Sequence, residues 1–132
     1  MMRLAVGVGC DRGTALSTIE TALEQALVLS QLSRKQIACI ASIDAKHDEV
    51  AILQLAGTHG WPIHFFSKEQ LAQVDVPNPS ETVLRYMGTP SVSEAAAILA
   101  GRTKSCNLLL EKHRLRGADG KNATISIAKM EG

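Results

Sequence analysis

The sequence predicts a three-layer α/β/α sandwich with a mostly parallel, mixed central sheet. Short apolar runs alternate with segments of helical periodicity, which is typical of strands joined by helical crossovers. Two late apolar runs are separated by turn residues, which indicates an antiparallel hairpin. The 132 residues are 45% hydrophobic but only 3% aromatic, so we expect one domain, residues 1–132, with an aliphatic core.

The first part of the chain alternates strand and helix three times. The predicted elements are strand 4–8, helix 14–31, strand 37–43, helix 48–56, strand 62–66 and helix 67–74. Thr14 or Ser17 is expected to cap the first helix, and Ser67 with Gln70 forms a capping box for the third. Right-handed crossovers would make the three strands parallel.

The second part adds helices and a hairpin. The predicted elements are a rigid turn at 77–80, helix 80–86, helix 91–100, and strands 107–110 and 123–128. Ser91 and Glu94 read as a capping box. The alanines at 95–97 make a thin helix that lets another backbone approach closely. The last two strands should pair with each other in antiparallel fashion and make the sheet mixed.

Charge is unevenly distributed along the chain. Residues 1–100 carry 7 Lys or Arg and 10 Asp or Glu, whereas residues 101–132 carry 7 and 3, so net charges of −3 and +4 sum to +1. The basic C-terminal part fits either an anionic ligand or a solvated surface loop. Near-neutral net charge, few aromatic residues and no matching motif argue against nucleic-acid binding.

The cysteines predict no special chemistry as a group. Cys10, Cys39 and Cys106 form no CxxC pair, so we expect neither a disulfide framework nor a metal site, and we expect no cofactor. Cys39 and Cys106 stand in apolar runs and are predicted to be buried thiols.

No signal peptide is recognisable, and no apolar run approaches the roughly 20 residues of a membrane span, so we expect a soluble cytoplasmic protein with no membrane contact.

Three loops should meet at one edge of the sheet, because ligands of open α/β sheets bind outside the carboxyl ends of the strands. These loops are residues 9–14, 42–46 and 66–68. In the first, Gly9 and Gly13 flank Arg12 and lead through Thr14 into a helix. A helix N-terminus and an arginine together suit a carboxylate or phosphate. The glycine spacing fits neither a dinucleotide site nor a P-loop, and a purely structural tight turn explains the loop equally well.

Other polar residues near this edge have both a structural and a functional interpretation. Cys10 lies near a helix start and Arg12, surroundings that lower a thiol pKa, but no histidine is placed as its base. Lys46 and Glu49 flank the start of the second helix, where Lys46 suits an anion and Glu49 complements the helix dipole. Lys112 and Arg114 follow a late strand and form either a binding group or the rim of the hairpin.

The stretch GTPSVSEAAA at 88–97 contains more polar detail than a helix start needs. The capping box explains Ser91 and Glu94. Thr89 and Ser93 are small hydroxyls beside a helix N-terminus and could hold a polar ligand.

Five sequence blocks in order resemble the cobalamin-biosynthesis CobE proteins and the C-terminal domain of CbiG. The blocks are GVGCDRGT at 7–14, SIDAKHDE at 42–49, the segment 66–80, GTPSVSEAAAIL at 88–99, and LLLEK with ATISIAK near the end. The resemblance implies a small α/β domain acting in corrin-ring construction. Full-length CbiG opens a lactone on a cobalt-containing intermediate but has an additional N-terminal domain, and this sequence is more similar to the stand-alone CobE of the aerobic route.

The family blocks, together with the loop chemistry, define a candidate set of substrate-binding residues. The set is Gly9, Cys10, Arg12, Gly13, Thr14, Lys46, Glu49, Ser91, Ser93, Glu94 and Lys112, and the blocks also include Gly88. Corrin intermediates carry carboxylate side chains on a flat apolar ring, so cations and helix N-termini are the groups expected to hold them.

Three functions remain open on the sequence. The first is an accessory or carrier protein that binds a precorrin or corrinoid intermediate. The second is a hydrolase that opens a ring lactone, with Glu49 or Glu94 as base or Cys10 as nucleophile. The third is a non-catalytic subunit whose alanine-rich helix packs on another corrin-pathway enzyme.

Overall fold

A computed structural model of the chain describes residues 2–76 and 91–131. The turn predicted at 77–80, the helix predicted at 80–86, and Gly88, Thr89 and Pro90 lie outside these residues.

The central sheet has five strands in the order β3-β2-β1-β5-β4. Its strands are β1 (Leu4–Cys10), β2 (Ile37–Ile43), β3 (Ile63–Phe66), β4 (Leu108–Arg116) and β5 (Asn122–Lys129). β1, β2 and β3 are parallel, whereas β5 runs antiparallel to both β1 and β4. This mixed sheet confirms the predicted fold class and the predicted hairpin.

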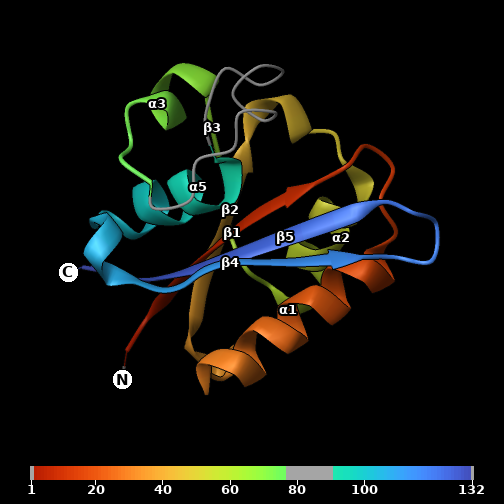
Figure 1. Cartoon of the computed structure of the whole chain (residues 1–132), viewed down its shortest axis with the longest axis horizontal. Coiled ribbons are helices and arrows are strands. Elements are labelled where there is room, and N and C mark those ends of the chain that lie inside the picture. Colours follow the sequence, from red (N-terminus) through yellow and green to blue (C-terminus); the bar gives the residue numbers. More distant parts are fainter. Residues whose placement is uncertain (1, 77–90, 132) are drawn as a thin grey trace.

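Helices cover both faces of the sheet (Figure 1). Among the described residues, the α-helices are α1 (Leu16–Ser30), α2 (Val50–His59), α3 (Lys68–Ala72) and α5 (Val92–Gly101), and the short 3-10 turns are η1 (Arg34–Gln36), η2 (Asp44–Lys46) and η3 (Ser105–Asn107). α1 and α2 lie on one face, and α3 and α5 lie on the other. Each face therefore has its own aliphatic core, as the low aromatic content predicts.

Helix α5 lies unusually close to β1, and Gly7 is the reason. A Cβ built on Gly7 would lie 1.8 Å from the carbonyl oxygen of Ser93 and 2.9 Å from the backbone nitrogen of Ala97. Alternation along β1 points Val6 and Val8 into the α1/α2 core, so Gly7 faces α5. The prediction that the thin alanine helix permits close backbone approach is confirmed. Its neighbour is the chain's own sheet, and Ala95, Ala96 and Ala97 are fully buried.

Several local predictions are wrong at helix ends. The N-cap of α1 is Ala15, and neither Thr14 nor Ser17 caps the helix, because the Thr14 hydroxyl donates to the Asp11 carbonyl instead. Ser91 is the N-cap of α5, but its hydroxyl accepts no capping hydrogen bond, so the predicted capping box with Glu94 is not formed. The capping box of Ser67 and Gln70 at α3 is confirmed.

Two further corrections concern the end of the chain. β4 extends through Arg116, so Lys112 and Arg114 lie within a strand and do not follow one. Cys39 is buried as predicted, but Cys106 is exposed because it lies in η3, before the strand begins.

Candidate functional site

The predicted ligand edge is formed where β1, β2 and β3 end at Cys10, Ile43 and Phe66, and we call it the carboxyl edge. The N-terminus of α5 lies toward the same edge. Ser93 contacts Gly7 in the middle of β1, whereas Gly101, at the other end of α5, approaches Ala5 near the beginning of β1. Four elements therefore contribute to this edge: the β1–α1 loop, η2, the start of α3 and the start of α5.

Glu49 closes the β1–α1 loop from inside the protein. Its carboxylate, only 5% exposed, accepts a hydrogen bond from the backbone N–H of Gly13 at 3.0 Å and one from Arg12 at 3.1 Å. The sequence predicts an anion at this backbone N–H and this guanidinium. The structure places the chain's own carboxylate there.

Arg12 is further engaged by two other acceptors. It pairs with Asp48 at 2.8 Å and donates to the Ala45 carbonyl at 2.7 Å. The hydrogen bond from Arg12 holds the pKa of the Asp48 carboxyl below its usual value. The Arg12 side chain is 57% exposed. Its hydrogen bonds nevertheless link the β1–α1 loop to the residues just before α2.

The hairpin fixes the other side of the same loop. Asp11 accepts from the backbone N–H of Asn122 at 2.8 Å and donates its own N–H to the Asn122 carbonyl at 3.0 Å. Lys121 reaches toward the carbonyl of Gly13 at 3.5 Å. Asn122 and Lys121 are partners of this loop that the sequence motifs did not predict. The available signal was the antiparallel pairing itself, since a strand starting near residue 123 brings Asn122 to the end of β1. Gly13 and Thr14 therefore belong to a loop that is held by hydrogen bonds within the chain.

Cys10 is not an activated thiol. It ends β1 and packs against the α1/α2 core. Burial raises its pKa to about 11, and the nearby charge of Lys46 offsets this only in part. The predicted lowering of its pKa is wrong because desolvation of the thiolate outweighs the neighbouring cation.

Lys46 and Ser91 are predicted site residues of this edge whose polar groups make no hydrogen bond or ion pair with the described residues. The half-buried Lys46 lies in η2, and its ammonium makes no hydrogen bond or ion pair with any residue in the described part of the chain. The Ser91 hydroxyl at the start of α5 is buried, with the residue 2% exposed, and has no hydrogen-bond partner among residues 2–76 and 91–131. A buried hydroxyl without a partner is uncommon and calls for an explanation.

The remaining candidates lie in different surroundings. Ser93 is buried and shares a 2.9 Å hydrogen bond with Ser126 of β5, which fastens α5 to the sheet. Glu94 is fully buried in the first turn of α5. Lys112 is half-buried in β4, at a register irregularity between Leu110 and His113. Gly9 lies at the edge, and of the described residues only Thr124 would come within 4 Å of an added Cβ.

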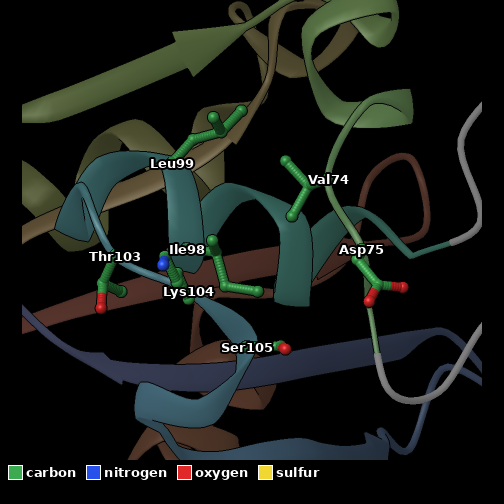
Figure 2. Close-up of a pocket in the computed structure, with 7 residues that line it drawn as sticks. All are labelled: Val74, Asp75, Ile98, Leu99, Thr103, Lys104 and Ser105. Carbon is green, nitrogen blue, oxygen red and sulfur yellow. The ribbon is translucent and has the colours of Figure 1, made fainter.

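A pocket of about 340 Å³ lies away from this edge, beside the C-terminal part of α5 (Figure 2). It is lined by Val74, Asp75, Ile98, Leu99, Thr103, Lys104 and Ser105. None of the candidate residues from the sequence belongs to it.

The fold and the carboxyl edge together define a small α/β domain with a polar surface beyond the ends of its parallel strands. Some polar groups of this surface make no hydrogen bond with the described residues. Residues 4–128 match the family model described as cobalamin synthesis G C-terminus. The chain belongs to this family and is a protein of cobalamin biosynthesis. The resemblance seen in the five sequence blocks is thereby confirmed.

Individual relatives include both types of protein that the sequence suggested. The chain is 36% identical over 125 residues to a cobalt-precorrin-5A hydrolase of Priestia megaterium, covering 95% of this chain but only 32% of the hydrolase. It is 33% identical over 111 residues to protein CobE of Sinorhizobium sp, covering 83% of this chain and 71% of that protein. It is also similar to the crystal structure of CobE, a protein from the cobalamin biosynthetic pathway, with a TM-score of 0.83, 32% identity, and coverage of 99% and 96%.

Across residues 2–76 and 91–131, no helix is long and apolar enough to cross a membrane. Within the same residues, no group of three or more His, Cys, Asp or Glu side chains is arranged to hold a metal ion.

Proposed function

We propose that this protein binds a precorrin or corrinoid intermediate at the carboxyl edge, as an accessory or carrier protein. The observation that carries the proposal is that two polar groups at this edge, the Lys46 ammonium and the Ser91 hydroxyl, make no hydrogen bond or ion pair with any described residue. An ammonium and a helix N-terminus are both suited to carboxylates, which corrin intermediates carry around the ring.

The family supports the ligand class. Relatives of this chain are named as a cobalt-precorrin-5A hydrolase and as CobE. The chain spans about a third of the hydrolase, so the activity of that longer protein does not transfer directly.

The chemistry of the edge favours binding over hydrolysis. A thiol with a pKa of about 11 is protonated at neutral pH and is a poor nucleophile. Both oxygens of the Glu49 carboxylate accept hydrogen bonds within the protein, from Arg12 and from the Gly13 N–H, and the side chain is only 5% exposed. Two of the three groups proposed from sequence as base or nucleophile are therefore occupied or inactive.

The test uses the colour of corrin intermediates. Purified protein is mixed with individual precorrin or cobyrinic-type intermediates and desalted, and the visible spectrum and ligand mass of the protein fraction are recorded. Co-elution with unchanged spectrum and mass supports a carrier. A new product mass would identify an enzyme instead, and no retained colour and no turnover with any intermediate would reject ligand binding.

A charge-removing variant locates the site. Lys46→Ala should weaken binding about tenfold or more if its ammonium contacts a ligand carboxylate. Lys35→Ala is the matched control, because exposed Lys35 lies in η1 at the opposite edge of the sheet. Equal affinities of the two variants would remove Lys46 from the site.

A further inference from the structure

Arg114 is an exposed cation on the same face of the sheet as α5. Register pairs Gly9 of β1 with Thr124 of β5, and Thr124 with Arg114 of β4. Residues directly opposite in antiparallel strands share a face. Gly9 shares the face of Gly7, because the two are separated by two positions, and Gly7 contacts α5. Gly9, Thr124 and Arg114 therefore form a row across three neighbouring strands on the α5 face.

The neighbouring row confirms this assignment of faces. Ile125 belongs to the α1/α2 core, and its partner His113 hydrogen-bonds Gln25 of α1 at 2.7 Å. Alternation then sends Thr124 and Arg114 to the opposite face. An added Cβ on Gly9 would lie 3.9 Å from the Cβ of Thr124, which places these two positions side by side.

Helix α5 stops short of this row. Its first turn contacts Gly7 through Ser93, and its N-cap is Ser91, whereas Gly9 lies about 6.6 Å further along the strand at the usual rise per residue. The free N–H groups of the first turn are directed beyond the helix start, toward the region of the row. The buried Ser91 hydroxyl, which has no partner in the described part of the chain, lies at that helix start.

We propose that the row Gly9–Thr124–Arg114 and the N-terminus of α5 form a carboxylate-binding shelf for a flat polycarboxylate ligand. The missing side chain of Gly9 leaves the shelf flat, so that the face of a ring can approach the backbone. Arg114 is exposed and makes no hydrogen bond or ion pair with any residue that the structure describes, so its guanidinium is available to bind a carboxylate in bidentate fashion. The inference rests on the proposed function, because it adds residues and a ligand orientation to the same edge.

The test uses mellitate, a flat benzene ring bearing six carboxylates, and backbone amide NMR of the full chain. Addition of mellitate should shift the amide signals of Gly9, Thr124 and the first turn of α5. Arg114→Gln should weaken mellitate binding about tenfold or more, because it removes a charged, bidentate contact. Arg3→Gln removes the same charge from an exposed arginine at the opposite end of β1 and should leave the affinity unchanged.

A second variant tests the flat surface independently of charge. Gly9→Val should retain the fold, since Gly9 has no positive φ and an added Cβ has room, but it should block the shelf. Shifts confined to other residues, or equal mellitate affinity of wild type, Arg114→Gln and Gly9→Val, would overturn the inference.

Corrinoid binding separates this inference from the proposed function. If the wild type retains a corrinoid and Arg114→Gln retains it equally well, the shelf is wrong and the proposed function stands. If mellitate binds the shelf but no corrinoid is retained, the shelf stands as a polycarboxylate site and the proposed function fails.

Discussion

Gly7→Ala is the substitution for which the structure makes the sharpest prediction. The new Cβ would lie 1.8 Å from the Ser93 carbonyl oxygen, 2.8 Å from the Ser93 carbonyl carbon and 2.9 Å from the Ala97 nitrogen. All three atoms are backbone atoms of α5, so no side-chain rotation relieves the clash. Helix α5 must move away from the sheet by roughly 1.5 Å to restore ordinary contact distances.

The cost follows from what that movement breaks. Ala95, Ala96 and Ala97 are fully buried against the sheet, and Ser93 is hydrogen-bonded to Ser126. Overpacking combined with the voids left under a displaced helix should lower the free energy of unfolding by about 3 kcal/mol or more. For a chain of this length, we expect a fall in Tm of roughly 10 °C.

Gly9→Ala provides a matched control two residues away on the same face. Its Cβ would have only Thr124 as a described neighbour, at 3.9 Å, so the free energy of unfolding should change by less than about 1 kcal/mol. Urea unfolding monitored by circular dichroism measures both variants. A Gly7→Ala protein as stable as Gly9→Ala would refute the close approach of α5 on which the position of its N-terminus depends.

The remaining predictions concern Glu49 and the thiols. Glu49→Ala should lower the free energy of unfolding by about 2 kcal/mol, because the Gly13 N–H loses its acceptor. The control Glu69→Ala, at an exposed position of α3, should change the free energy of unfolding by less than about 0.5 kcal/mol in the same urea experiment. A thiol reagent at pH 8 should modify Cys106 first, and mass spectrometry after digestion should find Cys39 and Cys10 largely unmodified, since Cys106 is exposed and the pKa of Cys10 is about 11. Burial raises the pKa of Cys10 from its ordinary value of 9.0, so as the pH rises the unfolded chain loses the thiol proton at a lower pH than the folded protein does. Stability should therefore be unaffected by this group below pH 9 and should fall between pH 9 and about 11. A Cys10→Ser variant should lack that part of the alkaline loss.

The sequence predicted the strands well because each follows from a local pattern. β2 has the predicted bounds, and the antiparallel hairpin follows from apolar runs separated by turn residues. β4 was predicted too short, since its second half alternates charged residues with His113 and Leu115, a pattern of a half-buried strand rather than of a loop. That error placed Arg114 in a connection and concealed its position opposite Thr124.

The polar contacts could not be predicted, because they depend on which groups meet in space. Thr14 has the right chemistry for a cap, but the Asp11 carbonyl is the nearer partner for its hydroxyl. Cys10 has a cation beside it in the sequence, but Arg12 is engaged by Asp48, Glu49 and Ala45, and burial decides the pKa of the thiol. The partner of Thr14 is only three residues away, whereas the carboxylates that engage Arg12 are more than 30 residues away, and for Cys10 the deciding effect is its burial.

The β1–α1 loop shows how a correct chemical expectation can point to the wrong ligand. Arg12 and the Gly13 N–H do bind a carboxylate, but Glu49 supplies it, so a ligand carboxylate would have to displace a buried internal one. The cations that remain available at the carboxyl edge are those that pair with no acid among the described residues. Lys46, after β2, and Arg114, on β4, meet this condition, and β1 and β5 lie between their strands in the sheet. The strands β2 and β4 are three interstrand spacings, roughly 14 Å, apart, so cations near both strands suit a ligand with carboxylates on opposite sides of a broad ring better than a small monoanion.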